Sequence, residues 1–192
     1  MNEPVHTFRL ATPDDAETLL KIYEPYIATT VTNETQVPAL GEFRQRIVER
    51  DGAYPYIVCE EDGRPVGYAY GSRLFSRAAY AWSAELSVYF STDHRGRGLG
   101  RAIYGKLFDL LALQGVRTVV GKVVCPNEKS DHLHEKMGFE LVGTLCAASW
   151  KLGVWHDVHL WEKHIGDVEA EPVPLLRLSE VDSEKVRAIL EA

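Results

Sequence analysis

The run Arg95-Gly96-Arg97-Gly98-Leu99-Gly100 is the part of the sequence best suited to bind an anion. Its three glycines let the backbone turn tightly and come close to a ligand. The run leads into a segment with helical periodicity, so its N–H groups would lie at a helix N-terminus, where unpaired donors and the helix dipole attract negative charge. Arg95, Arg97 and Arg101 add positive charge. The pattern predicts a phosphate or pyrophosphate site, and a purely structural turn is the alternative.

The glycine spacing separates this run from two common nucleotide-binding loops. It lacks the lysine of Gly-x-x-x-x-Gly-Lys-[Ser/Thr], and its glycines fall as Gly-x-Gly-x-Gly rather than Gly-x-Gly-x-x-Gly. We therefore predict neither a nucleotide P-loop nor a dinucleotide-binding fold.

Glu85 and His134 are the candidates for proton transfer. Alternate residues of a strand share a face, which groups Glu85, Ser87 and Tyr89 on one side and Leu86, Val88 and Phe90 on the other. A carboxylate on such a strand can accept a proton, although a solvent-facing glutamate would show the same pattern. A histidine can donate a proton near pH 7, and His134 can equally be a helix residue that only packs.

The elements that would position these groups follow from periodicity and turn residues. Strands are expected over 8–10, 56–60, 65–72, 79–90, 117–125, 139–145 and 155–161. Helices are expected over 13–24, from 40 onward, over 99–114 and over 130–137. Pro25 is expected to end the first helix, and Asp62-Gly63 to form a hairpin turn. This order predicts an α/β (α+β) fold with a mixed, mostly antiparallel sheet of about seven strands flanked by helices.

Composition excludes several classes of protein. The 192-residue chain carries a net charge of −7, which argues against general nucleic-acid binding, and it has no apolar run long enough for a membrane span. Met1-Asn2-Glu3-Pro4 lacks the features of a signal peptide. The three scattered cysteines, Cys59, Cys125 and Cys146, are expected to be buried free thiols in a reducing cytoplasm, with no metal site.

Several blocks of sequence resemble one enzyme family. The spacing Arg95-x-x-Gly98-x-Gly100 resembles the acetyl-CoA pyrophosphate loop of the GNAT N-acetyltransferases, and the order of elements over 8–163 resembles their fold. Further blocks resemble the phosphinothricin acetyltransferase subgroup: Asn33-Glu34-Thr35, Arg77-Ala78-Ala79-Tyr80, Glu85-Leu86-Ser87-Val88-Tyr89, Pro126-Asn127-x-x-Ser130, Leu133-His134-Glu135-x-x-Gly138-Phe139 and Lys151-x-Gly153-x-Trp155-x-Asp157-Val158.

This resemblance implies an acetyl-CoA-dependent N-acetyltransferase in which the amine of a small amino-acid-like substrate, of the phosphinothricin or methionine sulfoximine type, attacks the thioester directly. It implies Glu85 as the base and His134 as the group that protonates the departing thiolate. The cofactor would be held by the loop 95–101 and by Val88, Tyr89, Phe90, Asn127 and Ser130. The substrate side would include Asn33, Glu34, Thr35, Arg73, Arg77, Tyr80 and Trp82.

The remaining expectations concern domains and assembly. Residues 1–165 are expected to form the acetyltransferase domain, and 166–192 a C-terminal tail with a possible short helix that docks on the body or on a second subunit. The subgroup resemblance implies a homodimer. Two alternatives stay open, which are a GNAT enzyme that acts on a protein N-terminus or another amine, and a non-catalytic acetyl-CoA-binding sensor.

Overall fold

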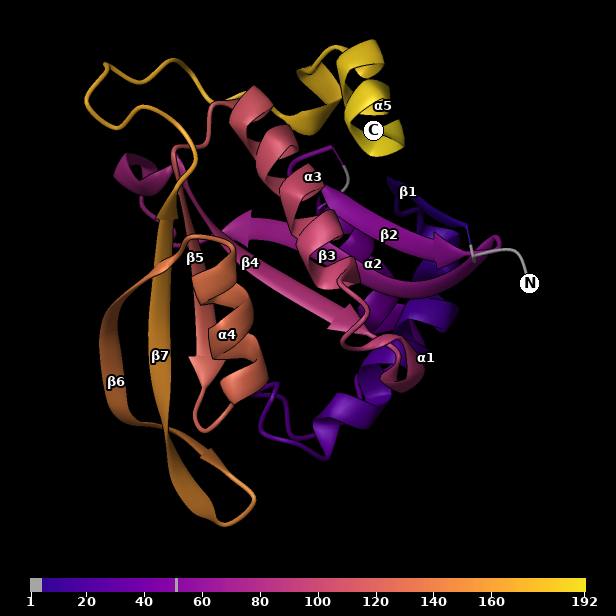
Figure 1. Cartoon of the computed structure of the whole chain (residues 1–192), viewed down its shortest axis with the longest axis vertical. Coiled ribbons are helices and arrows are strands. Elements are labelled where there is room, and N and C mark those ends of the chain that lie inside the picture. Colours follow the sequence, from indigo (N-terminus) through magenta and orange to yellow (C-terminus); the bar gives the residue numbers. More distant parts are fainter. Residues whose placement is uncertain (1–4, 51) are drawn as a thin grey trace.

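Seven strands form one sheet in the order β1-β2-β3-β4-β5-β7-β6 in the computed structural model, which describes residues 5–50 and 52–192 (Figure 1). The strands are β1 (His6–Leu10), β2 (Tyr56–Glu61), β3 (Arg64–Arg73), β4 (Ser83–Phe90), β5 (Thr118–Val124), β6 (Glu140–Lys151) and β7 (Val154–His164). β4 and β5 pair in parallel, and the other described neighbours are antiparallel. The predicted mixed, mostly antiparallel sheet is confirmed. Met1–Pro4, on which the signal-peptide prediction rests, lie outside the described residues.

Helices cover both faces of the sheet. α1 (Ala16–Ile27) and α2 (Leu40–Arg50) pack on the face toward which Val58 and Tyr68 point. α3 (Leu99–Gln114) and α4 (Glu128–Lys136) lie on the other face, toward which Ile57 and Leu86 point. Figure 1 shows α3 and α4 in front of the sheet and α1 and α2 behind it. Because alternate residues of a strand point to opposite faces, burial on both sides of the sheet explains the runs of consecutive buried residues over 56–59 in β2 and 66–69 in β3.

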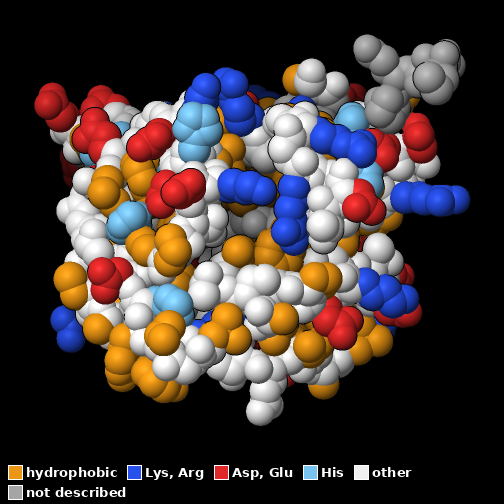
Figure 2. All heavy atoms as spheres, turned by 60° about the horizontal axis from the view of Figure 1, so that its bottom comes forward, with side chains coloured by type: hydrophobic (Ala, Val, Ile, Leu, Met, Phe, Trp, Pro, Cys, Tyr) orange, Lys and Arg blue, Asp and Glu red, His pale blue; other side chains and the backbone are white. Residues whose placement is uncertain are grey.

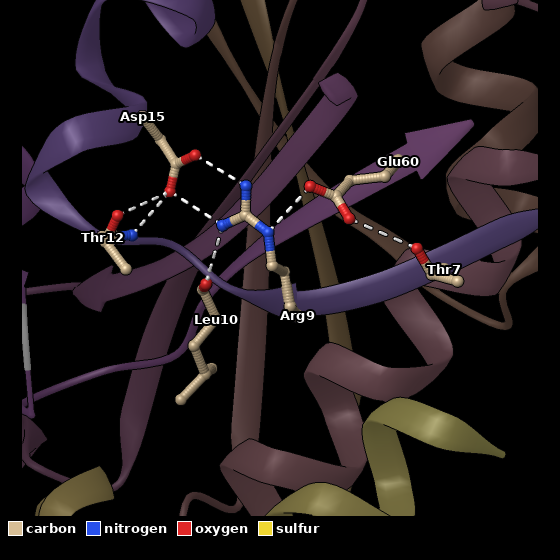
Figure 3. A network of polar contacts seen from close by, with 6 residues as sticks. All are labelled: Thr7, Arg9, Leu10, Thr12, Asp15 and Glu60. Atoms are coloured by element: carbon tan, nitrogen blue, oxygen red, sulfur yellow. Dashed lines mark hydrogen bonds and ion pairs between the residues drawn. The ribbon is translucent and has the colours of Figure 1, made fainter. Parts of the chain in front are cut away.

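Arg9 ties the first strand to the beginning of α1 (Figure 3). Its guanidinium donates to both carboxylate oxygens of Asp15 at 2.7 and 2.8 Å, and its Nε donates to Glu60 at 2.8 Å. Asp15 also accepts the backbone N–H of Thr12 at 2.7 Å. Burial acts to raise the pKa of Asp15, but the hydrogen bonds from Arg9 and Thr12 outweigh it and hold that pKa below its ordinary value.

Two predicted boundaries are wrong. The first helix does not end at Pro25 but continues to Ile27. Pro25 lies on the exposed side of the last turn, while the hydroxyl of Tyr26 bonds to the backbone C=O and N–H of Phe90 at 2.6 and 3.0 Å and holds that turn in place. The strand predicted from residue 79 begins only at Ser83, because Ala78–Tyr80 form a 3-10 turn.

The β6–β7 hairpin is longer than predicted. A two-residue turn at Leu152-Gly153, with φ values of 53° and 81°, lets Lys151 pair with Val154 and extends the antiparallel ladder.

The burial of the three cysteine thiols also differs from the prediction. Cys59 is buried, Cys125 is half-buried and Cys146 is exposed, because β6 lies at the edge of the sheet.

The C-terminal segment forms a helix on the body of the same chain. α5 (Ser183–Glu191) buries Val186 and Leu190 in the core and packs against α3 and β1. The ammonium of Lys106 in α3 donates to the carbonyl of Ile189 at 2.8 Å. α5 therefore extends the layer that covers the α3 face of the sheet (Figure 1).

Candidate active site

β4 and β5 separate after a short parallel pairing, and the separation creates a cleft. Their ladder ends at the pair Leu86–Gly121, whereas β4 continues to Phe90 and β5 to Val124. The cleft is lined by Val31, Leu86, Ser87, Val88, Tyr89, Tyr104, Gly121, Lys122, Val123, Asn127, Ser130 and His134. Figure 2 looks toward this end of the molecule and shows a recess with Lys and Arg side chains along one rim. Since strand backbone borders it on two sides, the gap suits an extended chain.

The glycine-rich run turns into the N-terminus of α3 next to the end of β4. Gly96 and Gly98 have φ values of +78° and +83°, a left-handed conformation that favours glycine. The N–H groups of Arg101 and Ala102 both bond to the carbonyl of Gly98, so the N–H groups of Leu99 and Gly100 precede the first helical bonds. This is the geometry expected of an anion site at a helix N-terminus.

The arginines of this run are held by neighbouring side chains. The guanidinium of Arg95 lies 4.4 Å from the centroid of the Tyr26 ring, and Arg97 contacts Glu61 at 3.1 Å. Glu61 also accepts a hydrogen bond from His94 at 2.7 Å, and this bond, opposed by burial and aided by the positive charges, keeps the pKa of Glu61 low. These side-chain contacts fix the position of the loop, and with it the position of the backbone N–H groups at the beginning of α3.

His134 is buried against the sheet at the point where β4 and β5 separate. Its Nδ1 donates to the carbonyl of Ser130 at 2.8 Å, which leaves Nε2 as the acceptor in the neutral ring. Nε2 is buried without a hydrogen-bond partner among the described residues, and a Cβ placed on Gly121 would meet it at 2.2 Å. Burial, opposed by the bond to Ser130, lowers the pKa of His134. The ring is thus set up to accept a proton, and donation requires it to take one up first.

Glu85 is paired with Lys122, a partner that sequence analysis did not anticipate. The Nζ of Lys122 lies 2.7 Å from Oε2 of Glu85, and the two side chains are 37% and 27% exposed. Glu85 is opposite Val120 in the parallel ladder, so Lys122, two residues further along β5, points to the same face.

The sheet separates the two proton-transfer candidates. Leu86 and Gly121 face α3 and α4, and His134 reaches Gly121 from that side. Glu85 and Lys122 point to the opposite face, toward the side where Tyr89 packs with α1. The cleft lies where the strands part and is lined by His134 and by Lys122, so a ligand in it would contact His134 directly and reach Glu85 beside Lys122.

The predicted cofactor residues of β4 and α4 meet at the same cleft. Asn127 caps α4, its Oδ1 accepting the N–H of Ser130 at 3.3 Å, and both residues line the cleft with Val88 and Tyr89. Phe90 is different, because the hydroxyl of Tyr26 takes both of its backbone groups.

The predicted substrate loop 33–35 lies near the cleft. Asn33 Oδ1 accepts from Ser149 of β6 at 2.6 Å, and Glu34 pairs with Arg46 of α2 at 2.5 Å. Val31, two residues earlier, lines the cleft, and Thr35 is exposed. This connection between α1 and α2 lies at the lower end of the sheet in Figure 1.

The other predicted substrate residues lie at the opposite end of β4. Arg73 pairs with Ala84 at the beginning of that strand, and Ala84 is about 17 Å from Tyr89 along an extended strand. Trp82 donates to the carbonyl of Val173 at 2.7 Å. Arg77 precedes the 3-10 turn, and the ring of Tyr80 packs on Phe75 with centroids 4.8 Å apart. Within one chain these four residues are not brought to the cleft.

Sequence analysis did not single out seven of the residues that line the cleft, which are Val31, Leu86, Ser87, Tyr104, Gly121, Lys122 and Val123. Lys122 falls within the strand expected over 117–125, and a lone lysine among apolar strand residues was the available signal. Tyr104 is fully buried in α3, with its ring centroid 6.0 Å from that of His134. It belongs to the apolar face of the helix, and nothing in its spacing marks it as part of a site.

Comparison with protein families decides the identity of the fold. The profile described as "Acetyltransferase (GNAT) domain" matches residues 8–160. The chain belongs to the GNAT acetyltransferase family. Within residues 5–50 and 52–192 of this GNAT chain, no helix is both long and apolar enough to cross a membrane, and no group of three His, Cys, Asp or Glu side chains is arranged to hold a metal.

Individual GNAT relatives match over most of the chain. A phosphinothricin N-acetyltransferase of Streptomyces viridochromogenes is 35% identical, covering 90% of this chain and 94% of its own. An L-methionine sulfoximine/L-methionine sulfone acetyltransferase of Salmonella typhimurium is 27% identical, covering 86% and 98%. The structure of a phosphinothricin acetyltransferase of Sinorhizobium meliloti in complex with acetyl-CoA superposes with a TM-score of 0.85 at 29% identity, covering 92% and 97%.

Proposed function

We propose that this GNAT protein is an acetyl-CoA-dependent N-acetyltransferase that acetylates the amine of a small amino-acid-like substrate of the phosphinothricin or methionine sulfoximine type. The observation that carries the proposal is the cleft between β4 and β5, with Glu85 on one face of the sheet and Nε2 of His134 on the other. The activities named for the Streptomyces and Salmonella relatives support this substrate class. We assign the activity to residues 1–165 and treat 166–192 as a tail.

The residues present fit acetyl-CoA. The N–H groups at the beginning of α3, framed by Gly96 and Gly98, would hold the pyrophosphate. The backbone of Val88 and Tyr89, beyond the end of the β4–β5 ladder, and the amide of Asn127 would hold the pantetheine arm. When bound, acetyl-CoA supplies an acetyl thioester that an amine can attack.

The two proton transfers of the reaction are assigned to groups on opposite faces of the sheet. Amines are mostly protonated near neutral pH, so a base must take a proton before the nitrogen can attack. Glu85, on the face away from α4, is the group we assign to that step, directly or through water. Nε2 of His134 on the other face can take up a proton inside the cleft and return it to a leaving group.

We also propose that two copies pair through β6 in a cytoplasmic homodimer. β6 is an edge strand of twelve residues, and an exposed apolar edge favours pairing with another chain. Its large exposed apolar side chains, with those of the adjoining β7, are Leu141, Val142, Leu145, Trp150, Val154 and Trp155. A solution mass of twice 21.6 kDa, reduced to the single-chain mass by Leu145→Lys, is the expected result; a single-chain mass for the unaltered protein would contradict the proposal.

The activity is tested by measuring thiol release from acetyl-CoA with a panel of amines. Phosphinothricin, methionine sulfoximine and methionine sulfone should release thiol, and mass spectrometry should find the N-acetylated products. Thiol release only with peptides that carry a free N-terminus would identify the protein as a GNAT enzyme that acts on protein N-termini. Calorimetric binding of acetyl-CoA without thiol release from any amine would indicate a sensor.

A further inference from the structure

Lys122 is the one Lys or Arg residue that lines the cleft in the described part of the chain. It extends from β5 one position beyond the last parallel pair, on the face that bears Glu85. On that face Lys122 lies opposite Leu160 of β7 and between Val120 and Val124 of β5, with Glu162 of β7 diagonal to it. The carboxylate of Glu85, at 2.7 Å, is its ion-pair partner there.

This ion pair constrains any amine that uses Glu85. An incoming ammonium must approach the same carboxylate that Lys122 occupies, and two cations next to each other repel. A simple amine that displaced Lys122 would break its 2.7 Å ion pair with Glu85 and bring no carboxylate of its own in exchange. A substrate that carries both an ammonium and a carboxylate can avoid this cost, because it can exchange one ion pair for two.

Building on the proposed function, we propose that Lys122 is a specificity-determining residue that binds the α-carboxylate of a zwitterionic amino acid while the α-ammonium faces Glu85. The Glu85–Lys122 pair sets a carboxylate beside an ammonium, a charge arrangement complementary to that of an α-amino acid, whose ammonium and carboxylate are separated by a single carbon. The partial exposure of both side chains gives them room to separate around the substrate. The site thus selects free amino acids over amines and amino amides.

The experiment compares L-methionine sulfone with its α-carboxamide, because neither compound has an acidic side chain that could engage Lys122 instead. The unaltered protein should prefer the acid. The amide's amino group loses its proton more readily, so chemistry without carboxylate binding would favour the amide. In Lys122→Met the acid-to-amide ratio of kcat/KM should fall about tenfold or more, the effect of losing a hydrogen bond to a charged group. Lys122→Arg should keep the preference for the acid, and Lys185→Met, on exposed α5, is the matched control.

Binding gives an independent measurement. Titration of L-methionine sulfone into protein saturated with CoA should show a Kd raised by a similar factor in Lys122→Met, while the Kd of CoA stays unchanged. If thiol release falls equally for acid and amide, or if the ratio is unaltered in an active Lys122→Met, Lys122 serves only as a structural partner of Glu85 and the inference is wrong. Lack of acetylation of every amine by the unaltered protein would overturn the proposed function itself, and this inference with it.

Discussion

Gly67→Ala tests whether packing at the end of β4 sets the stability of the site. Gly67 of β3 lies opposite Phe90 of β4, the residue whose backbone is held by the hydroxyl of Tyr26. A Cβ at residue 67 would lie 2.1 Å from Cδ1 and 2.3 Å from Cε1 of the Phe90 ring. Phe90 is only 6% exposed and packs in the core under α3.

The size of the effect follows from these distances. Carbon atoms in contact lie about 3.5 Å apart or more, so the ring must move by about 1.4 Å or the strands must separate. Overpacking of this kind costs about 1–3 kcal/mol. Replacing glycine in an open strand position by alanine has the opposite sign and stabilises by about 0.5–1 kcal/mol. The sign of the change therefore decides whether the contact with Phe90 controls this position.

Urea unfolding followed by tryptophan fluorescence measures the change in the free energy of unfolding. Gly67→Ala should lower the midpoint at an unchanged m-value. Gly143→Ala is the matched control, because a Cβ at residue 143 of β6 meets nothing within 4 Å and should leave stability unchanged or raise it. In a Phe90→Leu background, Gly67→Ala should cost at least about 1 kcal/mol less. Equal effects of the two alanine substitutions would refute the packing argument.

Four further predictions concern the cleft and the anchor of α1. Gly98→Val, at a φ of +83°, should raise the calorimetric Kd of acetyl-CoA about tenfold or more, whereas Gly153→Val, at +81° in the β6–β7 turn, should not. Glu85→Gln should lower kcat/KM about 10²–10⁴-fold at neutral pH and recover activity as the pH approaches the pKa of the substrate amine. Because burial lowers the pKa of His134 in the folded protein, its contribution to stability is present above the unfolded value of about 6.5 and is lost as the pH falls; His134→Asn should reduce the fall in urea midpoint over that window. Asp15→Asn should lower the free energy of unfolding by about 2 kcal/mol at pH 7, and by less as the pH falls through the depressed pKa of Asp15.

Each of these has an outcome that contradicts it. An unchanged Kd in folded Gly98→Val would mean that the glycine-rich run 95–100 does not bind the cofactor. Parallel pH profiles for Glu85→Gln and the unaltered protein would leave Glu85 a positioning role only. An acid dependence of stability that is identical in His134→Asn would assign that dependence to other groups. A pH-independent cost for Asp15→Asn would mean that its charge is not what anchors α1.

The sequence by itself determined the features that depend on short stretches of chain. The left-handed turns at Gly96 and Gly98, the hairpin at Asp62-Gly63 and the order of strands and helices all follow from local periodicity and from residues with special backbone preferences. The glycine spacing, taken together with the order of elements and the further sequence blocks, predicted the GNAT family, which the match over residues 8–160 confirms.

Contacts between distant segments set the limits of that prediction. α1 continues through Pro25 because Tyr26 bonds to Phe90, 64 residues away, and no local signal reports such a bond. β6 extends to Lys151 because β7 supplies a ladder for it. Propensity fixes an element only weakly where tertiary partners can satisfy its backbone groups.

Only the tertiary structure decided how the chemistry is arranged. The register of β4 and β5 ends their pairing at Leu86–Gly121, which opens the cleft and places Glu85 and His134 on opposite faces of the sheet. The same register brings Lys122 to Glu85 across 37 residues. It also leaves the predicted residues of the β3–β4 connection at the far end of the strand. A strand's own sequence shows which residues share a face, but the neighbour they meet depends on the pairing of segments far apart in the chain.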